Sequence, residues 1–373
     1  MKCLLFTHKN FQWVASEQTY ITDGGFPRQV EAIAHLFETV YIVFPQFASP
    51  QLLTQGVAIQ APNVRFVPLQ WRGGISWRSI VKNHLRLLLS YFKLFRQVDI
   101  IHCPLPSYVG VAPAILALLL RKRLWVRYCG NIQHPSTPIQ HLLIRLMRAT
   151  AHYSHVSYLA TGLGERPFHP HIPWIFATSL SEKEIRALQR CVDWKTTDPP
   201  IILWVGRLEP GKGVQQLIEI IQSAQCMKLP FQWHVVGDGR LRNLIQGLKW
   251  QDPNNQIKWD AYLPHPQLMK VFCRSSLLLF TSQGEGFPKV VHEAMAAGLP
   301  ILAHPVGPLP ELVRQGASIF WMDEHPESVV TQIQKVLDSP DYSKYGLVNQ
   351  RIARNFSLER WREVMKTSLR KFT

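Results

Sequence analysis

Short apolar runs alternate with segments of helical pattern along most of the chain, and this alternation limits the fold more than any other feature. The first series of expected strands is Lys2–Thr7, Val40–Phe44, Val64–Pro68, Asp99–Cys103, Leu124–Tyr128, His152–Ser157 and Trp174–Ala177. The second series is Ile201–Val205, Phe231–Val236, Ile257–Trp259, Leu277–Phe280, Ile301–Ala303 and Ile319–Trp321. Such alternation is typical of parallel sheets with helices on both faces. The sequence therefore predicts an α/β protein with two successive doubly wound, Rossmann-like domains and a ligand cleft between their strand ends.

A polar, proline-containing segment separates the two series of strands. It runs from Ser181 to Pro200, and we expect residues 181–200 to form the domain linker. The domains are then residues 1–180 and 201–356, which a chain of 373 residues is long enough to supply. The tail, residues 357–373, is basic and has a helical pattern.

The formal net charge of +16 is unevenly distributed and predicts an acidic partner. Residues 1–180 hold 17 Lys and Arg against 6 Asp and Glu, a net charge of +11, and the remainder has +5. A membrane face or a phosphorylated acceptor fits this sign, and we do not expect nucleic acid to be the partner.

Cysteine spacing and hydropathy place the chain in the cytoplasm. The six cysteines form no CxxC pair, which argues against a zinc site or a disulfide framework. The longest apolar run, Tyr108–Leu120, is shorter than the ~20 residues that cross a bilayer, so we expect a buried helix there. The first residues lack the pattern of a signal peptide.

The stretch Ser282–Gly307, SQGEGFPKVVHEAMAAGLPILAHPVG, predicts a loop followed by a short helix. Gly286 lies in the loop, and Pro288 suits the first position of a helix because its missing N–H would have no partner there. Gly298 is a typical helix end. The free N–H groups at the start of this helix would form an anion site.

Two carboxylates stand out in this stretch, Glu285 before the helix and Glu293 within it. Glu293 falls among apolar residues, where an acid is rarely found without a partner; a ligand or Lys289, one turn earlier, could serve. Two Glu residues eight apart in EGFPKVVHEAMAAGLP resemble the signature of retaining glycosyltransferases of family 4, which have the GT-B fold. The resemblance implies that Glu285 contacts donor-sugar hydroxyls and that Glu293 holds the nucleotide ribose. It also assigns the neighbouring Gly286, Phe287 and Pro288 to the donor site, and it implies that the helix of residues 357–373 crosses back onto the first domain.

The segment VGRLEPGKGVQQLIE matches the second signature of that family. A strand ends at Gly206, and Arg207 and Lys212 then bracket a Pro210-Gly211 turn. Two cations at the carboxyl end of a strand can neutralise a diphosphate leaving group, which is their role in the family. The alternative is that both are solvated loop charges. The chain has no Asp-x-Asp, so we expect no metal and no other cofactor.

The loop after the next expected strand, VVGDGRLRNL, is a third match. Gly237 and Gly239 make a tight strand-to-helix turn, which the family uses beside the nucleotide, although a purely structural turn remains an alternative. Asp260-Ala261 stands where the family usually has Gly, so the loop that meets the base differs.

Resemblance is looser in the first half, where the acceptor would bind. Gly24 and Gly25 match a glycine-rich loop near the donor phosphates and the acceptor. His102 is expected at the carboxyl end of a strand, where open α/β sheets bind ligands, although a core histidine is the alternative. Gly130 and Asn131 stand where many relatives carry a sugar-contacting His, and we expect them on the acceptor side.

The segment Trp71–Gln97 is basic and carries tryptophans. It suits the surface of an anionic membrane, or it is an amphipathic helix packed on the sheet with an ordinary basic outer face.

These features together predict a retaining, metal-independent glycosyltransferase that uses a nucleoside-diphosphate sugar, with UDP or GDP as the nucleotide. The acceptor would be a glycan or a lipid-linked hydroxyl, in cell-surface polysaccharide or glycolipid synthesis, and the protein could be peripheral on the inner membrane face. Alternatives are an epimerase or a phosphorylase of the same fold, or a non-catalytic binding protein. The residues expected to act in catalysis are Arg207, Lys212, Glu285 and His102.

Overall fold

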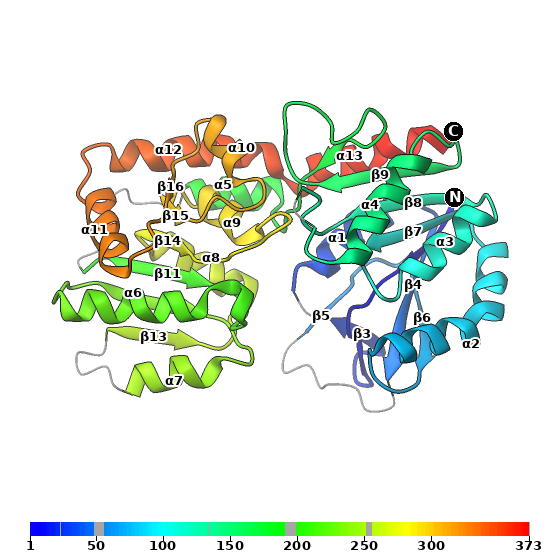
Figure 1. The fold of residues 1–373 in the computed structure, drawn as a ribbon, viewed down its shortest axis with the longest axis horizontal. Helices are drawn as coiled ribbons and strands as arrows, with labels where there is room; N and C mark the ends of the chain where they lie inside the picture. The colour runs from blue at the N-terminus through cyan, green and yellow to red at the C-terminus, as the bar shows by residue number, and fades with distance from the viewer. Residues whose placement is uncertain (23, 48–55, 134, 191–198, 251–255, 373) are drawn as a thin grey trace. The chain divides into compact units, whose positions relative to one another are not determined.

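The computed structural model describes residues 1–22, 24–47, 56–133, 135–190, 199–250 and 256–372. The chain divides into two compact units (Figure 1). The N-terminal unit comprises Met1–Ser179 and Leu358–Thr373, and the C-terminal unit comprises Leu180–Ser357. Among the described residues, no helix is both long enough and apolar enough to cross a bilayer.

The N-terminal unit is built on a parallel sheet with the strand order β10-β9-β8-β7-β1-β4-β6. Its strands are β1 (Lys2–Phe6), β4 (Thr39–Phe47), β6 (Val64–Trp71), β7 (Ile100–Leu105), β8 (Arg123–Tyr128), β9 (Val156–Thr161) and β10 (Trp174–Ile175). Its helices are α1 (Phe26–Ala34), α2 (Trp77–Arg96), α3 (Val111–Leu119), α4 (Pro138–Thr150) and α13 (Leu358–Leu369), followed by the 3-10 turn η3 (Arg370–Phe372). The chain moves outward from β1 to β6 and then returns to β7 on the other side of β1.

Helices cover both faces of this sheet. Alternate residues of β8 point to opposite faces, as strand geometry requires. Val126 and Tyr128 join the core under α2, α3 and α4, whereas the Trp125 Nε1–H donates to Ser368 Oγ of α13 at 2.8 Å. The tail after Ser357 therefore packs on the N-terminal unit.

The C-terminal unit has a second parallel sheet with the order β13-β12-β11-β14-β15-β16. Its strands are β11 (Ile201–Val205), β12 (Gln232–Val236), β13 (Ile257–Asp260), β14 (Leu277–Phe280), β15 (Ile301–Ala303) and β16 (Ile319–Trp321). The helices are α5 (Glu182–Arg190), α6 (Val214–Cys226), α7 (Arg242–Trp250), α8 (His265–Arg274), α9 (Lys289–Ala296), α10 (Leu309–Arg314), α11 (Pro326–Leu337) and α12 (Tyr342–Ala353), with 3-10 turns η1 (Pro210–Lys212) and η2 (Arg354–Phe356). Numbered from β11, this order is the 3-2-1-4-5-6 arrangement of the doubly wound dinucleotide-binding fold.

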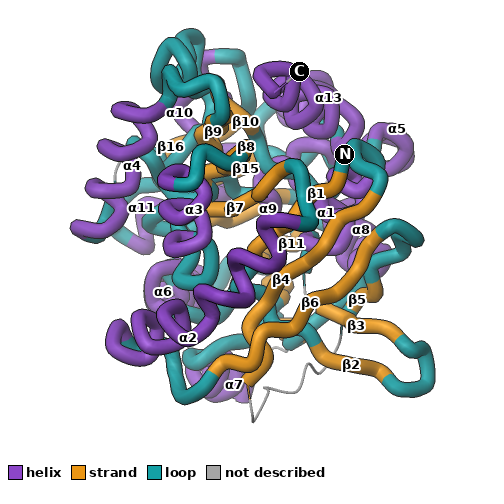
Figure 2. The backbone as a smooth tube through the Cα atoms, turned by 90° about the vertical axis from the view of Figure 1, so that its right-hand side faces the viewer, coloured by secondary structure: helices purple, strands orange, loops and turns teal. Residues whose placement is uncertain are grey.

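A small antiparallel sheet of β2 (Gln12–Val14), β3 (Thr19–Thr22) and β5 (Val57–Ala58) was not expected from the sequence. Figure 2 shows it beside β6. Tyr20 packs its ring against Phe44 of β4 and Phe66 of β6, with ring centres 5.3 and 5.0 Å apart. The turn from β2 to β3 contains no Gly, Asn or Pro, so the sequence carries no hairpin signal.

Three other expectations need correction. β9 starts at Val156, four residues after the expected His152, because α4 continues to Thr150 and a turn follows. Helix α3, expected to be buried, leaves Leu119 74% exposed. Residues 182–190 of the expected linker form α5 and belong to the C-terminal unit, while residues 191–198 lie outside the described residues.

Candidate functional site

The topology of the C-terminal sheet marks one place for a ligand. β11 and β14 are hydrogen-bonded neighbours, yet the chain leaves them toward opposite edges of the sheet. At such a switch point the loops after the two strands separate and leave a crevice at their carboxyl ends. The loop after β11 carries Arg207 and Lys212, and the loop after β14 carries Glu285.

The two loops are joined by hydrogen bonds through buried residues. Thr281, directly after β14, donates from Oγ1 to the Lys212 carbonyl at 2.8 Å and accepts from Trp204 Nε1 at 2.9 Å. Ser282 Oγ lies 3.4 Å from the Gly211 carbonyl oxygen. The backbone that carries Lys212 is therefore fixed relative to β14, and preorganisation of this kind is what electrostatic stabilisation requires.

Lys212 and Glu285, which are 73 positions apart in the sequence, form an ion pair at this switch point. The side chains retain only 22% and 18% of their exposure, so the charges are partly withdrawn from water. Ser282 Oγ donates to the same Glu285 oxygen at 3.0 Å. Arg207 precedes Lys212 in the same loop and, by contrast, is exposed to solvent.

Glycines allow the loops to approach this closely. Gly213 has φ +69°, and a Cβ there would lie 2.1 Å from the Thr281 carbonyl oxygen. Gly237, after β12, has φ +147°, and its Cβ would lie 1.8 Å from the Gly206 carbonyl oxygen. A Cβ on Gly239 would meet the Leu208 carbonyl at 2.5 Å. The glycine pair of the third motif thus has a packing reason, and the loop after β12 lies against the loop of Arg207.

The loop after β15 also reaches Glu285. A Cβ on Gly307 would lie 2.6 Å from the Glu285 carbonyl oxygen, so the two backbones are in contact. In the same loop, His304 Nε2 is 2.8 Å from Gln216 Oε1 of α6. Three loops at the carboxyl edge of one sheet therefore meet at Glu285: the loops after β11 and β14 at its carboxylate, and the loop after β15 at its backbone.

Helix α9 holds the second carboxylate, Glu293, which is only 7% exposed. The helix begins one residue later than expected, with Pro288 as its N-cap, and Gly298 in the left-handed conformation follows its end. His265, at the start of α8, places Nε2 4.0 Å from Glu293 Oε1. His265 Nδ1 lies 3.8 Å from Glu184 Oε1 of α5. Sequence analysis did not find His265, because His265, Glu184 and Glu293 come from three separate helices.

Asp260, which stands where the family pattern has Gly, closes the end of β13. Its Oδ2 lies 2.7 Å from His234 Nε2 of β12 and 3.6 Å from Lys258 Nζ. Burial lowers the pKa of His234, so the histidine is a neutral partner at neutral pH. This departure from the pattern is thus accommodated by a local cross-strand contact.

In the N-terminal unit, the glycine-rich loop and the Gly130-Asn131 pair occupy loops at helix starts and strand ends. Gly24 has φ +68° and is exposed, and Gly25 is the N-cap of α1. A Cβ on Gly130 would touch Pro106 Cδ at 3.3 Å, so the loops after β7 and β8 are in contact. Asn131 Oδ1 accepts from the Gln133 N–H at 3.1 Å, so the side chain is held by its own loop.

The expected position of His102 at a strand end must be corrected. The strand that was expected to end at Cys103 continues to Leu105, so His102 lies inside β7 rather than at its end. The side chain is fully buried, and Nδ1 donates to the Trp125 carbonyl at 3.0 Å. Burial, helped by the nearby Arg127, lowers the pKa of His102 to about 3. A neutral core histidine cannot contact an acceptor at the sheet edge, so we assign it no catalytic role.

A different histidine lies at the switch point of the N-terminal sheet, between β1 and β7. His8 follows β1 and is exposed, and its Nδ1 is 3.2 Å from Ser107 Oγ in the loop after β7. Sequence reasoning missed this pair. The available signal was the polar segment that follows the first apolar run at once.

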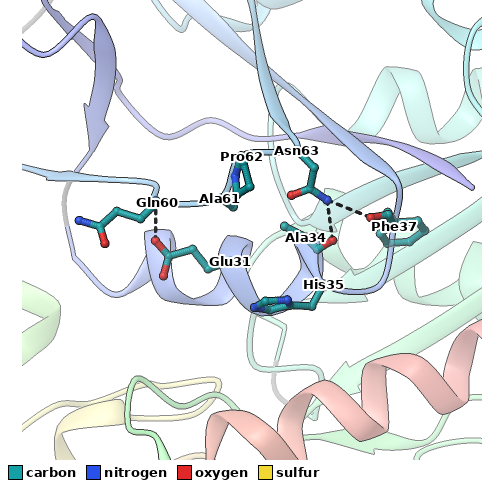
Figure 3. A pocket seen from close by; sticks show the side chains of 8 residues that line it. All are labelled: Glu31, Ala34, His35, Phe37, Gln60, Ala61, Pro62 and Asn63. Atoms are coloured by element: carbon teal, nitrogen blue, oxygen red, sulfur yellow. Dashed lines mark hydrogen bonds between the residues drawn. The ribbon is translucent and has the colours of Figure 1, made fainter.

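A pocket of about 450 Å³ at the end of α1 is lined by Glu31, His35 and Asn63 (Figure 3). It lies at the amino end of β6, whereas sheets of this kind bind ligands at the carboxyl ends of their strands. Asn63 precedes β6, and its Nδ2 donates to the Ala34 and Phe37 carbonyls, both at 2.9 Å. Asn63 therefore caps the end of α1. Within the described ranges, no cluster of His, Cys, Asp or Glu could hold a metal ion.

Known proteins resemble this chain in sequence, and the family match falls within the C-terminal unit. Residues 190–350 match the family model of group 1 glycosyl transferases. An uncharacterized glycosyltransferase of Methanocaldococcus jannaschii is 28% identical over 182 residues, which cover 48% of this chain and 45% of that relative. The match thus spans about half the length of the relative.

Solved structures match over nearly the whole chain. A sucrose-phosphate synthase of Thermosynechococcus elongatus has a TM-score of 0.69 and 17% identity, covering 100% of this chain and 99% of that one. Anabaena HepE, solved with UDP and glucose, has a TM-score of 0.65 and 18% identity, covering 99% of both chains. These likenesses confirm the GT-B fold, and together with the family match they support a glycosyltransferase.

Proposed function

We propose that this chain is a retaining glycosyltransferase of family 4 that transfers a sugar from a nucleoside-diphosphate sugar to a hydroxyl group. The observation that carries the proposal is the meeting of Lys212 and Glu285 at the switch point of the C-terminal sheet. Lys212 is a cation suited to a diphosphate, Glu285 is a carboxylate suited to sugar hydroxyls, and the two groups are in direct contact there. The match of residues 190–350 to the group 1 family supports the same assignment.

The donor would be held by charge at one end and by hydroxyl contacts at the other. Arg207 and Lys212 would bind the diphosphate and stabilise the charge that grows on it as the bond to the sugar breaks. Glu285 would accept hydrogen bonds from the sugar hydroxyls, and Glu293 would accept them from the ribose. The donor would also contact the loops that contain Gly24, Gly25, Gly206, Gly237, Gly239, Gly286, Phe287 and Pro288.

The ion pair between Lys212 and Glu285 suggests how these groups would exchange partners when a donor binds. When the diphosphate binds Lys212, Glu285 would be released toward the sugar, and Lys212 would have an anionic partner in both states. The exchange avoids leaving a partly buried charge unpaired, which would be costly. We propose that the transfer uses these cations rather than a metal ion, in keeping with the lack of an Asp-x-Asp in the sequence.

The acceptor would bind the N-terminal unit, near Gly130 and Asn131. We add His8 to this side in place of His102, because His8 is exposed at the switch point of its own sheet. The acceptor would be a glycan or a lipid-linked hydroxyl, in polysaccharide or glycolipid synthesis. The excess of cations in residues 1–180 supports work at the inner face of a membrane, from the cytoplasm.

Retained ligands and donor turnover test this proposal. Mass spectrometry of small molecules that the purified chain retains from a cell extract should detect a UDP-sugar or a GDP-sugar. Incubation with that donor alone should leave its sugar unchanged, and addition of the extract's glycans or glycolipids should yield nucleoside diphosphate and a product with the donor's anomeric configuration. Conversion of the donor sugar without acceptor would indicate an epimerase, and retention without any turnover would indicate a binding protein; either would contradict the proposal.

A further inference from the structure

The outer side of α2 carries large apolar side chains that the N-terminal unit leaves in solvent. Trp77, Leu85 and Leu89 are 71%, 63% and 76% exposed, and Val81 and Phe92 are exposed as well. Positions 77, 81, 85 and 89 are four residues apart, so their side chains form one stripe along the helix. This stripe is distinct from the inner face of α2, where Leu87, Tyr91 and Phe95 pack into the core.

The apolar surface continues onto the neighbouring helix. α2 and α3 are in contact and cover the same face of the sheet (Figures 1 and 2). On α3, Ile115 and Leu119 lie one turn apart and are exposed, and Leu120 follows them. More than half of the exposed large apolar residues of the described chain lie between Ile75 and Leu142. Patches of this kind mark interaction sites rather than ordinary surface.

Cations border this surface on one side. On α2, each of four stripe residues is followed directly by a cation, which places the cations about 100° further around the helix. These pairs are Trp77-Arg78, Val81-Lys82, Leu85-Arg86 and Phe92-Lys93. Residues 71–150 contain twelve Lys and Arg and a single acid, Asp99.

We propose that α2 and α3 dock the N-terminal unit on an anionic lipid bilayer. The α2–α3 surface consists of the apolar residues Trp77, Val81, Leu85, Leu89, Phe92, Ile115, Leu119 and Leu120, with the cations Arg78, Lys82, Lys93 and Arg96 beside them. The apolar stripe would enter the boundary between headgroups and acyl chains, while the cations contact the lipid phosphates. A helix with this arrangement lies in the plane of the interface.

Charge argues for a bilayer over another copy of the chain. A second copy would bring the same cations to the contact, and each chain has a formal net charge of +16. Like charges facing each other oppose association. An anionic bilayer supplies both an apolar layer and dense negative charge, which is the combination that this surface complements.

This partner adds to the proposed transferase function without depending on it. The surface lies on helices of the N-terminal unit, whereas the charged residues of the expected donor site, Lys212, Glu285 and Glu293, lie in the C-terminal unit. Vesicle binding can therefore be measured without a donor, an acceptor or turnover. If vesicle binding fails while nucleotide binding succeeds, this inference and the proposed work at a membrane face fail, and the proposed sugar transfer stands.

Vesicle flotation with the full chain tests it. We expect binding to vesicles of phosphatidylcholine and phosphatidylglycerol in equal parts, and little binding to phosphatidylcholine alone. Lys82→Gln with Lys93→Gln should lower partition onto the anionic vesicles by about 30-fold, the factor that corresponds to about 1 kcal/mol for each cation. Leu85→Gln with Leu89→Gln should lower it by about 100-fold, because two leucines no longer enter the boundary.

Matched variants on the other unit are the controls. Leu347→Gln, on α12, removes a leucine that is 55% exposed, and Lys335→Gln with Arg351→Gln removes two exposed cations. Both should bind as the wild type does. The inference is overturned if the wild type ignores anionic vesicles, or if the two α2 variants bind as well as the controls. It is also overturned if the leucine variant only converts a dimer to a monomer in sedimentation, because the surface would then be a protein interface.

Discussion

At the scale of single residues, the candidate site depends on two cations with different surroundings. Lys212 is held by an ion pair and by backbone hydrogen bonds to the loop after β14, whereas Arg207 is exposed. Charge that appears on a leaving diphosphate is stabilised best by cations already in place. Lys212 meets this condition through its ion pair and the hydrogen bond to its carbonyl, whereas Arg207 is exposed to solvent.

Replacement of either cation should therefore lower the rate of transfer far more than the stability of the fold. We expect Arg207→Ala and Lys212→Ala each to cost about 3 kcal/mol in the transition state, a ~100-fold loss in kcat. Steady-state kinetics with the donor found by mass spectrometry measure this loss, and Lys335→Ala in α11 serves as the control. Normal turnover by both variants would refute the assignment of the diphosphate site.

At the scale of the elements, the loops after β11 and β14 are packed so closely that Gly213 becomes indispensable. Gly213→Ala would force a Cβ to within 2.1 Å of the Thr281 carbonyl oxygen and strain a backbone at φ +69°. We expect a loss of about 2–4 kcal/mol in the free energy of unfolding. Gly284→Ala is the matched control, since its Cβ would meet nothing within 4 Å. Urea unfolding compares the two, and equal losses would contradict the packing described for these loops.

Helix α9 should also make the stability of the protein depend on pH. Burial lowers the pKa of His292 to about 4, and the ring donates from Nε2 to the Ala353 carbonyl at 3.1 Å. Because the unfolded chain takes up this proton near pH 6.5 and the folded chain only near pH 4, stability falls as the pH drops through that window.

Between pH 6.5 and pH 5, His292 alone should account for a loss of about 2 kcal/mol in the free energy of unfolding. His292→Gln keeps a donor for Ala353 and removes the titration, so its unfolding curve should change less over the same window. Urea unfolding at both pH values measures the difference. A variant with the same pH dependence as the wild type would show that His292 is not buried in its neutral form.

At the scale of the whole molecule, the N-terminal unit is closed by a segment from the far end of the chain. Trp361 of α13 is fully buried in this unit, and the Arg127 guanidinium lies 5.2 Å from the centre of its ring. We expect Trp361→Ala to cost about 3–5 kcal/mol in the stability of the N-terminal unit. Trp321→Ala, at an exposed tryptophan of β16, is the control. Thermal unfolding followed by near-UV circular dichroism should detect the difference, and two equal midpoints would mean that α13 contributes no core.

The sequence was sufficient to predict the architecture, because each buried parallel strand appears as a short continuous apolar run. Leu277–Phe280 and Ile201–Val205 are apolar throughout, and both were placed to the residue. The hairpin of β2 and β3 was missed because no glycine marks its turn, and its stability comes from Tyr20 packing on β4 and β6. The exposed leucines of α2 could be recognised only once Leu87, Tyr91 and Phe95 were seen to form the inner face.

The candidate site shows the same division between local and long-range information. The motifs named Lys212 and Glu285 separately, but their pairing depends on the order of β11 and β14 in the sheet. His265 approaches Glu293 from another helix, and no local pattern could have found it. His102 was misplaced for the opposite reason, because its strand ends two residues later than expected and puts it in the core rather than at the sheet edge.

The central claim is that a nucleoside diphosphate binds at the carboxyl ends of β11 and β14, and calorimetric titration tests it most directly. UDP and GDP are titrated into the wild type, Glu285→Gln and Glu293→Gln. We expect one nucleotide to bind the wild type and to bind Glu285→Gln at least as tightly, because Lys212 then has no competing carboxylate.

Glu293→Gln should lose about 1.5–3 kcal/mol of binding free energy, since the ribose loses a charged acceptor. Binding that is lost in Glu285→Gln and kept in Glu293→Gln would contradict this orientation of the donor, and no binding of either nucleotide to the wild type would contradict the claim itself.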